Sequence, residues 1–240
     1  MYGEADRFCR IDMNTLSTEH YSAALTGAPP GYVGSKEGTT LFNKEYIEGT
    51  YSKPGIVLFD EIEKADHEVI LTLLNVFDHG RLRVTSGQVD LDFTNTIVFM
   101  TSNLASKDIL QHADQTSDEV KRIVQEKLEE TFLPEFINRI DDILQFNRLE
   151  TDVAKQIVNM YTADLNARLK RHNSSVSLEA PFVTRLIDEG YDAKYGARAL
   201  KRSFRRSVEV PLAKRLVAGE SGEFLGRERE ITIKNTSINQ

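Results

Sequence analysis

The chain has 240 residues, a formal net charge of −7 and a single cysteine. Its length suits one domain or two modest ones, and the 40% hydrophobic and 28% charged residues are ordinary for a globular protein. The acidic balance argues against nucleic acid as a bulk electrostatic partner, and no apolar run approaches the length of a membrane span. One cysteine excludes a disulfide framework and a cysteine metal cluster, so a reducing compartment is expected. Cys9 lies in an apolar stretch, which favours a buried, inert thiol over a nucleophile.

Four short apolar segments predict strands in the first part of the chain. They are residues 9–13, 56–60, 96–101 and 143–146. The second and third are continuous apolar runs, which are typical of parallel strands covered by helices on both faces.

Between these segments, apolar residues recur with helical spacing. One predicted face consists of Ile70, Leu73, Leu74 and Phe77, and another of Val120, Ile123, Val124 and Leu128. Residues 106–117 are polar and are predicted to be a surface connection. The alternation of strand and helix predicts an α/β domain with a parallel sheet flanked by helices.

After Asn147 the pattern becomes that of a smaller, α-rich domain with a little sheet. We expect helices through residues 153–165, 181–189 and 197–218, the last interrupted by Pro211, and strands at 176–178 and 230–234. We therefore predict a large domain over residues 1–149 and a small domain over residues 150–240. A basic strip, Lys201, Arg202, Arg205 and Arg206, is interpreted as a solvated helix face, with nucleic-acid contact as the alternative.

An apolar strand that ends in two adjacent acids is the first feature with chemical meaning. Residues 56–61 read Ile-Val-Leu-Phe-Asp-Glu. At the carboxyl end of a parallel strand, Asp60 could hold the Mg²⁺ shell of a nucleotide, and Glu61 could polarise the attacking water. The alternative for either acid is a helix N-cap.

Three other polar residues suit the same chemistry. Asn103 ends the run Met-Thr-Ser-Asn, where its amide could reach a γ-phosphate and the attacking water, or simply form a turn. Arg139 and Arg198 precede the predicted strand at 143–146 and open the basic helix, respectively. A guanidinium directed at a phosphate neutralises charge during phosphoryl transfer. The alternative is a surface ion pair, for Arg139 with Asp141 or Asp142.

A glycine-flanked loop, Gly31-Tyr32-Val33-Gly34, follows Ala28-Pro29-Pro30. An aromatic and an aliphatic side chain presented on such a loop suggest a surface that grips another molecule. The alternative is an ordinary turn with a packed tyrosine.

Taken in order, these segments resemble Clp-type AAA+ ATPases, and among those the second ATPase domain of the ClpB-type disaggregases. The resemblance is carried by residues 10–13 (Arg-Ile-Asp-Met), 27–34 (Gly-Ala-Pro-Pro-Gly-Tyr-Val-Gly), 58–65 (Leu-Phe-Asp-Glu-Ile-Glu-Lys-Ala), 78–82 (Asp-His-Gly-Arg-Leu), 100–103, 134–141 (Pro-Glu-Phe-Ile-Asn-Arg-Ile-Asp) and 195–198 (Tyr-Gly-Ala-Arg). Such a set in one order is highly specific.

The resemblance implies a role for each candidate residue. Asp60 would be the Walker B acid, which binds Mg²⁺ through water, and Glu61 the catalytic base. Asn103 would be the sensor-1 residue, and Arg198 the sensor-2 arginine in contact with ATP. Arg139 would be an arginine finger that acts on the ATP of a neighbouring subunit.

The resemblance also implies how the whole protein works. Tyr32 and Val33, between Gly31 and Gly34, would be the pore-loop pair that grips substrate, and residues 85–90 would fall in a second pore loop. ATP and Mg²⁺ would be the cofactors. Identical or related subunits would form a ring, most simply a hexamer, that threads unfolded or aggregated polypeptide, with no nucleic-acid or membrane partner. The expected compartment is the cytoplasm, with a mitochondrion or another organelle as the alternative.

One departure from the family pattern concerns nucleotide binding. No G-x-x-x-x-G-K-[ST] loop occurs in the chain. In the family this Walker A loop precedes the strand at 9–13, so the chain is expected to begin inside the helix that follows the loop. A strand missing beside residues 96–101 would leave unpaired edges. The alternative function is therefore a truncated, nucleotide-free paralogue that acts only as a binding or regulatory module in rings of full-length subunits.

Overall fold

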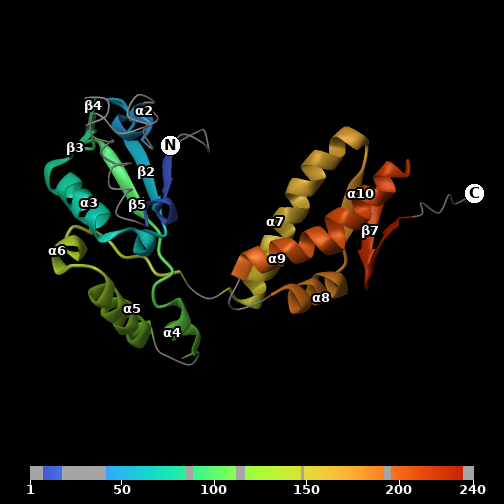
Figure 1. The fold of residues 1–240 in the computed structure, drawn as a ribbon. Coiled ribbons are helices and arrows are strands. Elements are labelled where there is room, and N and C mark those ends of the chain that lie inside the picture. Colours follow the sequence, from blue (N-terminus) through green and yellow to red (C-terminus); the bar gives the residue numbers. More distant parts are fainter. Residues whose placement is uncertain are drawn as a thin grey trace, which may run out of the picture. The chain divides into compact units, whose positions relative to one another are not determined.

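The computed structural model describes residues 8–17, 42–84, 89–111, 117–146, 149–191 and 196–234. The chain divides into two compact units, Met1–Ile143 and Leu144–Gln240, and each is described by itself (Figure 1). The first is an α/β unit with a parallel sheet, and the second is α-rich with a small sheet, as predicted. The domain boundary that we predict between residues 149 and 150 remains a prediction. None of the described helices is both long and apolar enough to cross a membrane.

The sheet of the first unit confirms three of the predicted strands. They are β1 (Cys9–Asp12), β2 (Gly55–Asp60) and β5 (Thr96–Met100). All neighbours are parallel and the order is β1-β2-β5, so within the described residues β5 pairs only with β2. The register aligns Asp12 with Asp60 and Phe59 with Met100, so the strands end at one edge.

Only one face of this sheet is fully covered by described residues. Ile11, Val57 and Phe59 are at most 2% exposed and belong to the core that includes helix α3. On the opposite face of β5, Ile97 and Phe99 are 42% and 52% exposed. The predicted burial of both strand faces is therefore wrong for β5, because side chains alternate along a strand and no described helix covers the second face.

Helix α3 (His67–His79) confirms the apolar face predicted around Ile70 and Leu73. Its N-cap, Asp66, accepts a hydrogen bond from the Glu68 amide at 3.0 Å. Gly80 ends the helix with a left-handed φ of 66°, which a glycine adopts without steric cost. Both boundaries are thus set by local sequence chemistry.

Directly after α3 the chain forms an antiparallel hairpin that the sequence analysis did not predict. Its strands are β3 (Arg81–Val84) and β4 (Val89–Asp92). Arg83 pairs with Asp90 across the hairpin at 2.9 Å. Four of the residues expected in a second pore loop, 85–88, lie outside the described residues. A short helix, α2 (Lys44–Glu48), precedes β2.

Two predictions near the end of the first unit are wrong. The first six residues of the expected surface connection form a helix, α4 (Ser106–Gln111). Residues 143–146 form no strand, and Ile143, Leu144 and Phe146 are 44%, 75% and 93% exposed. An extended segment becomes a strand only when a neighbour accepts its backbone hydrogen bonds, and no described strand lies beside this one. Helix α5 (Ser117–Thr131) appears as predicted, and α6 (Pro134–Ile137) follows it.

The second unit packs helices against a three-stranded sheet. The helices are α7 (Thr151–Leu169), α8 (Ala180–Gly190), α9 (Gly196–Phe204) and α10 (Val210–Val217), and the strands are β6 (Ser175–Leu178), β7 (Glu223–Arg227) and β8 (Glu230–Ile233). Strand β7 was not predicted. The core contains Phe182, Leu200 and Phe224, all fully buried.

Pro211 interrupts the regular α-helical hydrogen bonding of the predicted basic helix. Between α9 and α10 lies a π-helical turn, Arg205–Glu209, in which the Val210 amide donates to the Arg205 carbonyl. Proline lacks an amide hydrogen and its ring clashes with the carbonyl four residues earlier, so the chain widens locally. The basic strip is exposed along this segment, as predicted.

One side chain substitutes for a strand neighbour beside β6. Asn166 on α7 accepts a hydrogen bond from the Val176 amide at 2.7 Å and donates to the Val176 carbonyl at 2.9 Å. The amide group therefore satisfies both backbone groups of a strand residue that lies at the edge of the small sheet.

Candidate functional site

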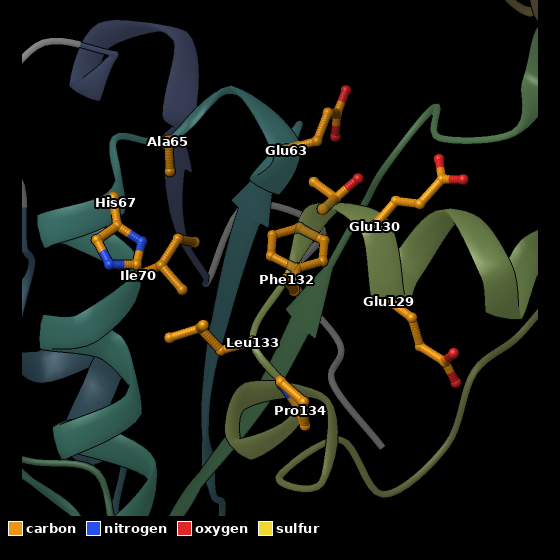
Figure 2. Close-up of a pocket in the computed structure, with 10 residues that line it drawn as sticks. Glu63, Ala65, His67, Ile70, Glu129, Glu130, Phe132, Leu133 and Pro134 are labelled. Atoms are coloured by element: carbon orange, nitrogen blue, oxygen red, sulfur yellow. The ribbon is translucent and has the colours of Figure 1, made fainter.

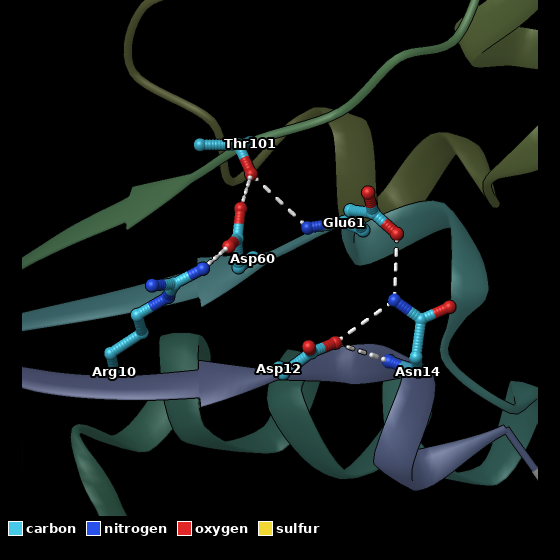
Figure 3. Close-up of polar contacts among 6 residues, drawn as sticks. All are labelled: Arg10, Asp12, Asn14, Asp60, Glu61 and Thr101. Atoms are coloured by element: carbon cyan, nitrogen blue, oxygen red, sulfur yellow. Dashed lines mark hydrogen bonds and ion pairs between the residues drawn. The ribbon is translucent and has the colours of Figure 1, made fainter. Parts of the chain in front are cut away.

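The two predicted acids lie at the edge where the parallel strands end. Asp60 is the last residue of β2, opposite Asp12 at the end of β1. Thr101 comes directly after β5, and its amide donates to the Phe59 carbonyl at 2.9 Å. Ligands of open α/β sheets bind outside the carboxyl ends of the strands, which is where this cluster lies (Figure 3).

Two donors fix the Asp60 carboxylate. The Thr101 hydroxyl donates to Oδ1, and the guanidinium of Arg10 on β1 forms an ion pair with Oδ2. The Asp60 side chain is 22% exposed and that of Arg10 is 58% exposed, so the carboxylate remains close to solvent. Asp60 does not cap the following helical turn, and its side chain is instead oriented across the strand ends.

Glu61 adopts an unusual backbone conformation beside it. Its φ of 57° and ψ of 55° lie in the left-handed region, which is uncommon for a residue with a side chain. The Glu61 amide donates to the Thr101 hydroxyl at 3.1 Å, and the Asn14 side-chain amide donates to Glu61 Oε2 at 2.6 Å. Although Glu61 occupies the N-cap position of a 3-10 turn, its side chain makes no capping bond. The carboxylate is thus held above the strand ends rather than used as a cap.

Asn14 connects two acids of the cluster. Its side-chain nitrogen also donates to Asp12 Oδ1, at 2.9 Å (Figure 3). Because Asn14 donates to both carboxylates, it fixes the Glu61 side chain relative to the end of β1.

Asn103 lies two residues beyond Thr101 at the same end of the sheet. It is exposed, and its backbone carbonyl accepts a hydrogen bond from the Ser106 amide at 3.2 Å. The Asn103 side chain forms no hydrogen bond with another residue in the described part of the chain. The location suits the expected contact with a phosphate and a water, and that role stays a prediction.

Arg139 contacts an acid that the sequence analysis did not consider. It follows α6, and its Nε donates to Asp78 Oδ1 near the end of α3, forming an ion pair. The alternative partners, Asp141 and Asp142, form no ion pair with it. The Arg139 side chain is 50% exposed.

The remaining predicted site residues lie in the second unit or outside the described residues. Arg198 is exposed on the first turn of α9, in the second unit. Tyr32, Val33, Gly31 and Gly34 lie outside the described residues. Their roles therefore stay predictions.

Sequence reasoning did not identify four residues of the cluster: Arg10, Asp12, Asn14 and Thr101. The available signal was topological, since parallel strands that end in polar residues bring those residues to one edge. Arg10, Asp12 and Thr101 lie within the motifs that carry the family resemblance, at 10–13 and 100–103. Asn14 gave no signal, because its contact with Glu61 depends on the 3-10 turn Met13–Leu16 that follows β1.

A separate cavity of about 340 Å³ lies between the start of α3 and the connection from α5 to α6 (Figure 2). Its lining includes Glu63, His67, Glu130 and Phe132. Both carboxylate oxygens of Glu63 are buried without a hydrogen-bond partner. Neither Asp60 nor Glu61 lines this cavity, so it is distinct from the strand-end cluster.

The described residues fit one kind of metal site and not another. They contain no group of three or more His, Cys, Asp or Glu side chains that could enclose a metal ion. Mg²⁺ bound with a nucleotide needs only one or two carboxylates, because phosphates and waters complete its shell. Asp60, held at the strand end with its carboxylate near solvent, fits this second mode.

Cys9 is not part of the cluster chemistry. Its side chain is 4% exposed, and burial raises the pKa of the thiol, while a backbone hydrogen bond from Asn43 lowers it to a smaller extent. A protonated, buried thiol is a poor nucleophile, which agrees with the prediction of an inert cysteine.

Comparison with protein families identifies both parts of the chain. Residues 1–143 match the AAA domain (Cdc48 subfamily), and residues 149–227 match the C-terminal, D2-small domain of ClpB protein. In solved structures, the chain resembles a closed-state cryo-EM reconstruction of Hsp104 with ATPγS and FITC-casein. The TM-score is 0.78 at 31% identity, over 94% of this chain and 39% of that one.

Curated relatives agree with these matches. The chain is 45% identical over 232 residues to AmiB of Pseudomonas aeruginosa, an ATP-dependent protease ATP-binding subunit-like protein, covering 90% of this chain and 62% of that protein. It is 39% identical over 229 residues to the chaperone protein ClpB of Aquifex aeolicus, covering 92% of this chain and 22% of ClpB. The chain thus spans less than two thirds of the length of each relative.

Proposed function

We propose that this chain, which belongs to the AAA domain family and carries a ClpB-type D2-small domain, works in an ATP-driven machine. The proposed machine is a protein unfoldase or disaggregase. The proposed activity is ATP hydrolysis coupled to threading polypeptide through a ring of identical or related subunits. The ring is most simply a hexamer, and the compartment most simply the cytoplasm. ATP and Mg²⁺ are the proposed cofactors, with Mg²⁺ supplying charge neutralisation at the transferred phosphate.

The observation that carries this proposal is the way the Glu61 carboxylate is held. A general base must be fixed where it can reach the attacking water. Glu61 is fixed by the left-handed backbone, by the Thr101 hydroxyl and by the Asn14 amide, next to an Asp60 that is itself held by two donors. This arrangement supports Asp60 as the residue that binds the Mg²⁺ shell and Glu61 as the base.

The other roles follow the family pattern. Asn103 would contact the γ-phosphate and the water, Arg198 would contact ATP from the small domain, and Arg139 would act on the ATP of the adjacent subunit. Tyr32 and Val33 would grip the substrate.

Tyr32→Ala should then abolish unfolding of a model substrate in the native ring while basal ATP hydrolysis continues, whereas Tyr32→Phe should retain unfolding.

Substitution of the proposed base tests the hydrolytic role. In the ring assembled from the native, full-length protein, Glu61→Gln should keep ATP binding and lower turnover about 10²–10⁴-fold, since the amide cannot accept the proton of the water. Glu68→Gln, at an exposed acid in the first turn of α3, is the matched control and should change little. Turnover near that of the unmodified protein would remove Glu61 from the mechanism.

The second candidate function is a binding or regulatory module in rings of other subunits. The observation in its favour is that these 240 residues contain no G-x-x-x-x-G-K-[ST] loop. Backbone amides and the lysine of such a loop supply most contacts to the β- and γ-phosphates. Isothermal titration of the 240-residue chain with Mg-ATP should therefore show weak binding or none. Stoichiometric binding in the low micromolar range would show that another segment holds the phosphates.

A further inference from the structure

We propose that Asp78 is a positioning residue for Arg139: it holds the guanidinium so that its two terminal nitrogens point outward, ready for a phosphate on the neighbouring subunit. This inference rests on the proposed function, because it takes Arg139 to be the arginine finger. It adds a residue from α3, far from Arg139 in sequence, to the catalytic interface.

The contact with Asp78 leaves the two terminal nitrogens of the Arg139 guanidinium available for a phosphate. The Nε–H group of Arg139 donates to Asp78 Oδ1. A guanidinium has five N–H donors, and the other four lie on the terminal nitrogens. No other residue among those described accepts a hydrogen bond from them, and the side chain is half exposed. A carboxylate on Nε alone therefore orients the planar group without occupying the end that would bind phosphate oxygens.

Rigid packing beneath the ion pair fixes both partners. Phe77, next to Asp78, contacts Phe136 with ring centroids 5.8 Å apart, and Phe136 contacts Phe132 at 5.2 Å. Phe136 is 1% exposed, and its carbonyl accepts a hydrogen bond from the Arg139 amide at 3.1 Å. The backbones that carry Asp78 and Arg139 are thus joined through one aromatic cluster. A functional side chain supported in this way keeps its geometry better than one on an unsupported loop.

The position of Asp78 also connects the finger to the hairpin. Asp78 lies in the last turn of α3, and β3 begins at Arg81, directly after the glycine that ends the helix. The Gly80 carbonyl accepts a hydrogen bond from the Phe93 amide at 2.7 Å, which ties this turn to the residue that follows β4 at the open end of the hairpin. Asp78 therefore lies on a turn that is fixed both by the aromatic cluster and by the hairpin.

A merely structural ion pair would behave differently from a positioning contact. Exposed pairs contribute little to folding, so Asp78→Asn should leave the thermal unfolding midpoint nearly unchanged in either case. A positioning contact, in contrast, restricts a long and otherwise freely rotating side chain before the reaction. Its loss should lower the rate of hydrolysis and leave the affinity for ATP in the same subunit unchanged.

The contact itself can be tested on this chain by NMR. The Nε–H signal of Arg139 should exchange slowly with water in the unmodified chain, because it is hydrogen-bonded, and should exchange much faster after Asp78→Asn or Asp78→Ala. Asp142→Asn is the matched control, since it removes an acid close to Arg139 in sequence that forms no ion pair with it, and it should leave the signal unchanged. Equal exchange in the unmodified chain and in Asp78→Ala would overturn the proposed contact.

Steady-state kinetics of the native, full-length ring test its consequence. Asp78→Asn should lower kcat about tenfold, because the Arg139 side chain would have to lose its rotamer entropy during the reaction instead of before it. KM for ATP should stay the same, Asp78→Glu should recover part of the rate, and Asp142→Asn should have no effect. Asp78→Asn combined with Arg139→Ala should be no slower than Arg139→Ala alone.

Two outcomes separate this inference from the proposed function beneath it. Full activity of Arg139→Ala would show that Arg139 is not a finger, which overturns the proposed role and this inference together. An inactive Arg139→Ala protein with an unchanged kcat in Asp78→Asn would overturn the positioning role of Asp78 alone.

Discussion

The left-handed backbone of Glu61 places its carboxylate above the strand ends. In the extended conformation of β2, the residue after Asp60 would point to the opposite face of the sheet, because side chains alternate. The positive φ of 57° redirects the chain at this point, so that the Glu61 carboxylate accepts from Asn14 and the Glu61 amide donates to the Thr101 hydroxyl, which itself donates to Asp60. The same conformation carries a steric cost that the surrounding hydrogen bonds offset.

That cost predicts a stability difference between two small residues at position 61. Glu61→Gly and Glu61→Ala both remove the carboxylate and its bond to Asn14, but only glycine adopts a positive φ without strain. We expect the glycine variant to have the larger free energy of unfolding, by about 1 kcal/mol, in urea denaturation of this chain. An alanine variant of equal or greater stability would mean that the backbone at this position is not strained.

At the scale of secondary-structure elements, one side-chain amide connects a helix of the second unit to the edge of its sheet. Asn166 on α7 satisfies the amide and the carbonyl of Val176 on β6. The sheet neighbour β7 lies on the other side of β6, so Asn166 on the helix supplies the hydrogen-bond donor and acceptor that a further strand would supply to Val176. The contact thereby sets how α7 packs along the small sheet.

Removal of this amide should destabilise the second unit. Asn166→Ala leaves a partly buried donor and acceptor without partners, which costs about 1–3 kcal/mol each when no water replaces the partner. Asn159→Ala on the exposed side of the same helix is the matched control and should change stability little. Amide hydrogen exchange at Val176 reports the effect locally, and protection that is unchanged in Asn166→Ala would contradict it.

The elements that the sequence predicts well are those with strong local signals. Helix α3 combines an aspartate N-cap, an apolar face and a terminal glycine, and β2 is a continuous apolar run. Residues 143–146 look equally apolar but form no strand, because pairing depends on a neighbour that local sequence does not show. Strand β7 was missed for the converse reason: its partners β6 and β8 make it a strand, although its own five residues, Glu-Phe-Leu-Gly-Arg, include a glycine and show no regular alternation.

The candidate site shows the same division between local and tertiary information. Asp60 and Glu61 follow an apolar strand, which makes them candidates, but the local pattern left a helix N-cap as the alternative and their roles came from the family resemblance. The contacts of Asn14 with Glu61 and of Asp78 with Arg139 join residues that are 47 and 61 positions apart, and neither pair has a sequence signature. Such contacts depend on strand register and helix packing, which periodicity does not specify.

At the scale of the whole molecule, the proposed finger distinguishes a ring from a monomeric ATPase. Arg139→Ala subunits keep their own Glu61, and Glu61→Gln subunits keep their Arg139. If the arginine acts across the interface, mixed rings should regain hydrolysis wherever an intact Glu61 faces a neighbour's intact Arg139, although each variant alone is nearly inactive. A finger supplied in trans is typically worth about 10³–10⁵ in rate, so the recovery should be easily measured by phosphate release. Its absence in rings shown to be mixed would exclude action in trans.

The uncovered side of β5 has a consequence for how the chain can associate with other molecules. Within the described residues this strand has one neighbour, and Ile97 and Phe99 are exposed beside its open edge. An edge of this kind accepts extended polypeptide from other molecules, and surfaces of this kind attract chaperones and proteases. An edge that stays open in this way would favour association of the chain with other extended polypeptides.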